Sequence, residues 1–275
     1  MSRYTILADV AGQRSLAAEG SDRMTAAAVA VSTSDAASLR DQVRQLPKWR
    51  DCSHSEAQAA VDHMRSRAAS IAVVSMTKDP RRWPEFWVAA KPLQDAIVAQ
   101  DRRPAGFVKP SNVALFAILA HAYGIAIGHA LKVSRGIQIV DYRGVELIER
   151  TIICDTDIQG EENLSAFKSF FEHSGEHHPR MAELGFRFET RDVIVTTEQD
   201  EPLLLLADYA AGIAHSAHIE KPGRIPLPIA HEPAKVLMRE LDKSGKLVVL
   251  DKAFDVDYAE VFGEAHSIAS EQRAR

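Results

Sequence analysis

The chain has 275 residues, of which 46% are hydrophobic and 26% charged, and its formal net charge is -5. This length allows a sizeable core in one large α/β domain. Because the net charge is negative, the protein surface as a whole does not attract polyanions. Any contact with nucleic acid therefore needs a local basic surface. Cys52 and Cys154 are far apart and have no metal-type spacing. Together with the lack of a signal-peptide pattern before Tyr4, they predict a cytoplasmic protein without disulfide bonds.

Apolar patterns in chain order predict strand pairs first and then strands separated by helices. Strands are expected at 4–12, 25–33, 69–77, 136–144, 150–157 and 191–199, with a hairpin-like segment at 246–254. Helices are expected at 34–46, 55–67, 111–131, 161–175, 202–218 and 235–241. This order predicts an α/β fold with a mixed sheet that is covered on both faces.

The segment 111–131 contains no Lys, Arg, Asp or Glu and has about the length of a membrane span. His121, His129 and a high alanine content favour a buried helix instead. We therefore expect no membrane association. The same uncharged helix could pack against its own sheet or against a second subunit, which leaves a homo-oligomer open.

Three aspartates lie at the end of, or within, apolar segments that are predicted to form strands or a helix. We expect these elements to bring the three side chains to one edge of the sheet. Asp9 and Asp155 come at the ends of strand-like segments, and Asp208 lies within the apolar sequence "EPLLLLADYAAG". A buried carboxylate without a partner is costly or takes up a proton. A few carboxylates gathered at one place are the usual ligands of Mg²⁺ or Mn²⁺, and two such ions support phosphodiester hydrolysis.

Each aspartate also has a structural interpretation. Asp9 could stabilise a turn through its side chain, and Asp155 could cap a following helix. Asp208 could form a structural ion pair with an arginine such as Arg143 or Arg187.

Four short motifs, in order, carry a resemblance to a known family. They are the turn Asp9-Val10-Ala11-Gly12, the segment "QLPKWRD" with Lys48 and Trp49, the strand-end Asp155, and the helix Leu204-Leu205-Leu206-Ala207-Asp208. The chain resembles the domain of unknown function 3800 family, whose members have a ribonuclease H-like fold and are regarded as metal-dependent nucleases. The resemblance implies an α/β ribonuclease H-like mixed sheet flanked by helices at 1–221. A small C-terminal extension at 222–275 would pack on it. Lys48 would contact the scissile phosphate.

The chain departs from the family pattern at several positions. Val10 replaces the second acid of the first turn, Gln45 or Leu46 replaces a glutamate before Lys-Trp, and Leu205 replaces a glutamine. Three outcomes follow: one metal ion suffices, catalysis has been lost, or neighbouring acids contribute. Those neighbours are Asp157, Asp141 and Glu198.

The segment 78–110 combines arginines with aromatic side chains, which suits phosphate neutralisation and base stacking on single strands. The candidate substrate-binding residues are Arg81, Arg82, Trp83, Arg102 and Arg103. An ordinary loop anchored by its tryptophans is the competing interpretation.

The leading functional hypothesis is a metal-dependent phosphodiester hydrolase that acts on RNA or DNA, in which Asp9, Asp155 and Asp208 hold Mg²⁺ or Mn²⁺. The alternative is a catalytically degenerate relative that binds nucleic acid or a protein partner without cleavage. A third option is an enzyme that acts on small phosphorylated metabolites.

Overall fold

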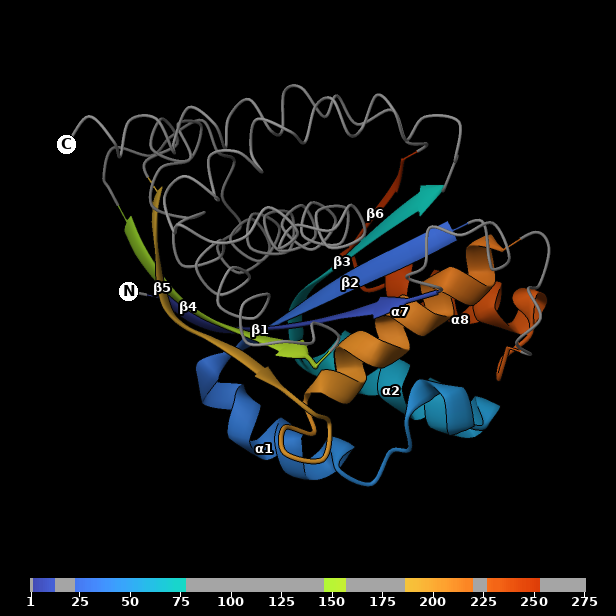
Figure 1. Cartoon of the computed structure of the whole chain (residues 1–275), viewed down its shortest axis with the longest axis horizontal. Coiled ribbons are helices and arrows are strands. Elements are labelled where there is room, and N and C mark those ends of the chain that lie inside the picture. The colour runs from blue at the N-terminus through green and yellow to red at the C-terminus, as the bar shows by residue number, and fades with distance from the viewer. Residues whose placement is uncertain (1, 13–22, 78–145, 157–185, 220–226, 253–275) are drawn as a thin grey trace, which may run out of the picture.

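The computed structural model describes residues 2–12, 23–77, 146–156, 186–219 and 227–252. Within these residues, a six-stranded sheet carries helices against one face (Figure 1). Side chains on the other face of the central strands are buried as well, among them Ile6, Ala28 and Ala72. The sheet is therefore buried on both faces, as the sequence pattern predicts.

The sheet is mixed, with strand order β5-β4-β1-β2-β3-β6. Its strands are β1 (Ser2–Ala11), β2 (Arg23–Ser32), β3 (Ala68–Thr77), β4 (Glu146–Asp155), β5 (Phe186–Thr196) and β6 (Leu247–Lys252). Strand β2 is antiparallel to both β1 and β3, whereas the pairs β1–β4, β4–β5 and β3–β6 are parallel. The antiparallel start followed by parallel strands confirms the predicted α/β class and the predicted mixed sheet flanked by helices.

In the described ranges, four α-helices and one short 3-10 helix accompany the sheet. They are α1 (Thr33–Val43), η1 (Trp49–Asp51), α2 (His54–Arg67), α7 (Leu204–His218) and α8 (His231–Asp242). Helix α2 begins with a capping box, in which the Ser53 side chain accepts the backbone N–H of Glu56 and the Glu56 side chain accepts that of Ser53. All of these helices contribute to one hydrophobic core with the sheet.

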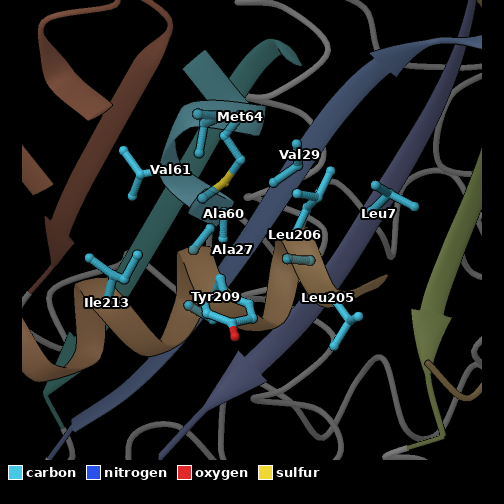
Figure 2. Packing of buried hydrophobic residues seen from close by; sticks show 14 of the residues in the cluster. Leu7, Ala27, Val29, Ala60, Val61, Met64, Leu205, Leu206, Tyr209 and Ile213 are labelled. Atoms are coloured by element: carbon cyan, nitrogen blue, oxygen red, sulfur yellow. The ribbon is translucent and has the colours of Figure 1, made fainter. Parts of the chain in front are cut away.

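Helix α7 packs on β1 and β2 at the centre of this core (Figures 1 and 2). Leu206 of the helix lies over the sheet beside Leu7 and Val29, and all three side chains are fully buried. Burial of each such side chain contributes about 1.5–3 kcal/mol relative to leaving it exposed. This packing fixes the orientation of α7 and therefore the direction in which its polar residue points.

The segment after α1 crosses α7 at a glycine. The ring of Trp49 packs against Gly212 so closely that a Cβ there would lie 2.4 Å from ring carbons. The Trp49 ring also meets the Tyr209 ring edge-on, with centroids 5.8 Å apart. Trp49 therefore locks the segment that carries Lys48 onto α7.

The structure differs from the sequence prediction in several details. Strands β4 and β5 begin at residues 146 and 186, earlier than the predicted starts at 150 and 191. The hairpin-like segment 246–254 contains β6, which pairs in parallel with β3. Helix α8, which lies after the predicted domain boundary at 221, packs on α2 and α7. The boundary itself stays a prediction. The elements expected at 111–131, 136–144 and 161–175 lie outside the described residues.

None of the helices in the described ranges combines the length and the apolar character that a membrane crossing requires.

Candidate functional site

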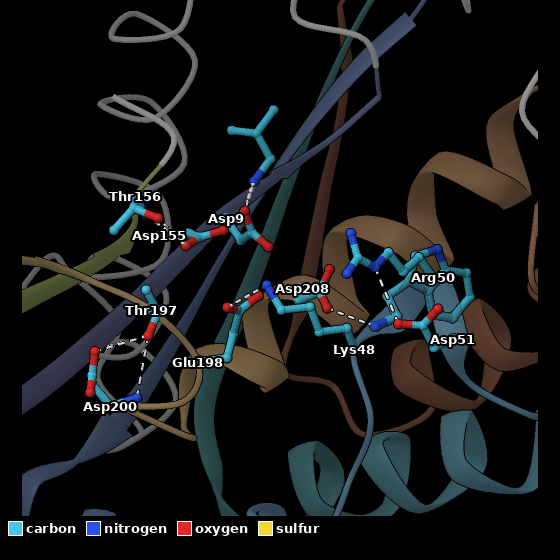
Figure 3. Close-up of polar contacts among 12 residues, drawn as sticks. Asp9, Lys48, Arg50, Asp51, Asp155, Thr156, Thr197, Glu198, Asp200 and Asp208 are labelled. Carbon is cyan, nitrogen blue, oxygen red and sulfur yellow. Dashed lines mark hydrogen bonds and ion pairs between the residues drawn. The ribbon is translucent and has the colours of Figure 1, made fainter. Parts of the chain in front are cut away.

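The three predicted aspartates meet at one end of the sheet, beside α7 (Figure 3). Strands β1 and β4 run in parallel with Ala8 opposite Cys154, so Asp9 and Asp155 occupy neighbouring positions at the carboxyl ends of both strands. Asp208 approaches from the start of α7, which packs on β1. Electrostatic repulsion couples Asp9 to both Asp208 and Asp155. The expected convergence of the three acids is thus found in the structure.

Asp9 is the most deeply buried of these acids, with 7% of its surface exposed. Its Oδ1 accepts the backbone N–H of Val10 at 2.6 Å. Burial raises the pKa of Asp9 well above its usual value, and the negative charges of Asp208 and Asp155 raise it further. Asp9 therefore needs a proton or a cation nearby.

Asp155 ends β4 and is partly exposed. Its Oδ1 accepts the backbone N–H of Thr156 at 2.6 Å and the Thr156 hydroxyl at 3.2 Å. These local bonds fix the carboxylate at the strand end. The residues of the helix that it was expected to cap lie outside the described ranges.

Asp208 is the one residue of α7 between 204 and 217 that is not fully buried. Its Oδ2 accepts the backbone N–H of Trp49 at 2.7 Å. Burial raises the pKa of Asp208 to about 6; the Trp49 bond opposes this shift, Glu198 and Asp155 add to it, and Lys48 opposes it. The side chains of Arg143 and Arg187, the predicted ion-pair partners, lie outside the described residues. In the described part of the chain, a backbone amide takes the place of the guanidinium.

Glu198 is a fourth acid at this site. Its Oε2 lies 2.7 Å from Nζ of Lys48, and its side chain is only 6% exposed. Glu198 follows β5 in a turn where the Thr197 hydroxyl donates to Asp200 and the Thr197 carbonyl accepts the Asp200 and Glu201 N–H groups. This turn directs Glu198 towards Asp208 (Figure 3). From the sequence, Glu198 was predicted only as a neighbouring acid that could replace a missing ligand. Its position directly after a strand, similar to that of Asp155, is the signal that could have ranked it higher.

Lys48 is the cation that the described residues bring to these acids. Burial alone would lower its pKa, but the hydrogen bond and the charge of Glu198 outweigh burial and raise it. Asp155 and Asp208 act in the same direction. With 39% of its side chain exposed, Lys48 is charged and reaches solvent. Three of the four carboxylates, those of Glu198, Asp155 and Asp208, therefore share the ammonium group of Lys48.

The donor set fits a hard divalent cation in chemical type, because all the candidate ligands are carboxylate oxygens. Over the described ranges, however, no three His, Cys, Asp or Glu side chains stand in a metal-holding arrangement. One oxygen each of Asp9 and Asp208 instead accepts a backbone N–H, from Val10 and Trp49, and one oxygen of Glu198 forms an ion pair with Lys48. Ligation would require these carboxylates to turn towards one another.

The predicted substrate-binding residues cannot be placed relative to this site. Arg81, Arg82, Trp83, Arg102 and Arg103 lie outside the described residues, as do Asp141 and Asp157.

No protein-family model matches the chain, and no curated protein matches it either. Among solved structures, the chain is similar to ribonuclease H2 from Pyrococcus horikoshii OT3. The TM-score is 0.40 and the sequence identity 10%, over 87% of this chain and 99% of that one. Similarity at this level carries no information about activity.

Proposed function

We propose that this protein is a divalent-metal-dependent phosphodiester hydrolase that cleaves RNA or DNA, with Asp9, Asp155 and Asp208 as the ligands of Mg²⁺ or Mn²⁺. The observation that carries the proposal is the meeting of three acids from distant segments at one end of the sheet, two of them with raised pKa values. Such a cluster destabilises the fold unless a cation compensates it. Perturbed acids of this kind are typical of functional sites.

Each residue has a distinct part in the proposed reaction. Asp9 and Asp208 supply buried oxygens at fixed positions, because β1 and α7 are held in the core. Asp155 supplies a more exposed oxygen next to Asp9. When bound, the cation would activate the attacking water and stabilise the charge that develops on the scissile phosphate. Lys48 would neutralise a non-bridging phosphate oxygen from the solvent side of the acids.

The resemblance to the domain of unknown function 3800 family is part of this proposal. It is supported by the arrangement of the motif residues: the Lys48-Trp49 segment lies against the Leu-Ala-Asp helix, with the Trp49 amide bonded to Asp208. At the departure Val10, the side chain is buried and the backbone N–H donates to Asp9, so this position supports Asp9 without supplying a ligand.

The test is a cleavage assay with the full chain. Labelled single-stranded and double-stranded RNA and DNA are incubated with Mn²⁺ or with EDTA, using the wild type, Asp208→Asn and Asp62→Asn. Asp62 lies on the exposed face of α2 and serves as the matched control.

We expect cleavage in Mn²⁺ that EDTA abolishes, that Asp208→Asn loses and that Asp62→Asn keeps. Nucleic-acid binding without cleavage, unchanged in Asp208→Asn, would support the degenerate relative instead. No interaction with any of the four nucleic acids would end the proposal.

A further inference from the structure

Glu198 and Lys48 form a pair that the proposed function leaves unexplained. We infer that Glu198 is a fourth carboxylate of the cation site, and that Lys48 is its internal counter-ion, so that the ammonium group and a divalent cation compete for the same acids. This inference rests on the cation of the proposed function. It adds Glu198 as a ligand of that cation. It also assigns Lys48 two alternating positions, one paired with Glu198 and one released from it.

The first argument is the burial of Glu198. A glutamate with 6% of its side chain exposed is rare unless it is paired or binds a metal. Its partner in the structure is the end of a lysine side chain that is itself 39% exposed. Lysine carries its charge on a flexible four-carbon stem, so the ammonium group can leave without any movement of the backbone.

The second argument is that Asp9 has no positive charge in direct contact among the described residues. Its Oδ1 takes the Val10 N–H, and within the described part of the chain Asp9 makes no other hydrogen bond or ion pair. Asp9 is more than nine-tenths buried, and it lies among Asp208, Asp155 and Glu198. The Asp9 carboxylate thus has three negative neighbours and no positive charge in direct contact. A cation among these acids would supply the missing compensation.

The third argument is the charge balance. Four carboxylates meet the single positive charge of Lys48, and that charge lies directly on Glu198. Asp9 receives no such contact. A divalent cation placed among the four acids would neutralise them better than the ammonium group does, because it carries two charges and accepts several oxygens at once. Binding would then draw Glu198 away from Lys48.

The fourth argument is the fixed backbone of Lys48. The following residue, Trp49, donates its N–H to Asp208 and packs its ring on Gly212. Released from Glu198, the ammonium group therefore stays beside the acids. It is then available for the phosphate contact that the proposed function requires of it.

Direct measurement of Mn²⁺ binding tests the inference without reference to activity. Isothermal titration calorimetry on the full chain, without nucleic acid, compares the wild type with Lys48→Met, Lys48→Arg, Glu198→Gln and Asp62→Asn. Circular dichroism and urea unfolding in EDTA establish that each variant is folded.

Lys48→Met is expected to bind Mn²⁺ about fivefold more tightly, because one competing ion pair is removed. Glu198→Gln is expected to bind about tenfold more weakly, because a ligand is lost. Lys48→Arg keeps a competing positive charge, so it should lack the tighter binding of Lys48→Met. Asp62→Asn lies away from the acids and should match the wild type.

Failure of the inference and failure of the proposed function give different results. If the wild type binds Mn²⁺ and cleaves nucleic acid, but Lys48→Met binds no more tightly or Glu198→Gln no more weakly, the inference alone is wrong. If the affinities shift in opposite directions as expected but nothing is cleaved, the proposed function alone is wrong. A wild type that binds no Mn²⁺ overturns both.

Discussion

Asp208→Asn is expected to make the protein more stable when divalent cations are absent. Asparagine has the shape of aspartate, and its carbonyl oxygen can accept the Trp49 N–H that Asp208 accepts at 2.7 Å. The substitution removes the charge but leaves the hydrogen bond and the packing of α7. The net effect is therefore a gain in stability, because the repulsion between Asp208 and the other acids and the cost of burying its charge are both removed.

The magnitude follows from the pKa of Asp208. Raising a carboxyl pKa from 3.8 to about 6 costs the ionised folded state about 3 kcal/mol. Asp208 is only partly buried and shares its repulsion with the other acids, so the measured gain should fall between about 1 and 3 kcal/mol. For a chain of this size, each kcal/mol raises Tm by about 2–4 °C.

The pH dependence has a definite sign. Because the folded pKa is raised, the folded state holds more protons than the unfolded state between about pH 4 and pH 6. Stability of the wild type therefore falls as pH rises through this window. Asp208→Asn lacks this loss, so its advantage should be near zero at pH 4 and complete at pH 8.

Urea unfolding followed by circular dichroism, in EDTA at pH 4, 6 and 8, measures the effect. Asp62→Asn, the same substitution in an exposed ion pair on α2, should change stability by less than about 1 kcal/mol at pH 6 and 8. An Asp208→Asn protein that is less stable than the wild type at pH 8, or whose advantage is equal at pH 4 and pH 8, would refute the reasoning.

Three further substitutions test the packing and hydrogen bonds that hold the site. Gly212→Ala should cost about 1–3 kcal/mol in urea unfolding, because its Cβ would overlap the Trp49 ring; in a Trp49→Ala background the cost should vanish. Arg40→Ala should cost about 1 kcal/mol, because it removes two 2.8 Å bonds to Glu201 before α7, and Arg40→Lys should restore only part of it. Ser53→Ala should cost about 1 kcal/mol by removing the cap of α2, and Ser53→Thr, which keeps the hydroxyl, should restore most of the stability; equal loss in both variants would contradict the cap.

The α/β class was predictable because the central strands are apolar in sequence and buried on both faces. The start of β4, before Arg150, was missed for the opposite reason. Glu149 and Arg150 look like loop residues, yet both are buried. Glu149 pairs with Arg3 at 2.7 Å, and Arg150 donates to Thr190. These partners come from neighbouring strands, and a local pattern does not contain them.

The candidate site divides in the same way. Asp9, Asp155 and Asp208 could be found because each follows or interrupts an apolar segment, which is a local signal. Glu198 sits in a polar turn and resembles a solvent-exposed residue. Its burial depends on Lys48, which the fold brings from a distant part of the chain, so sequence alone could not rank it with the other three.

The position of Asp9 on β1 separates the site into a rigid part and an adaptable part. Strand β1 is hydrogen-bonded on both sides, to β2 and to β4, so its amides should exchange with deuterium only when the whole domain opens. Glu198 is carried by a turn outside the sheet and can re-orient while the strands stay closed. A ligand that enters this site would therefore be positioned by Asp9, whereas Glu198 would adjust its orientation to the bound ligand.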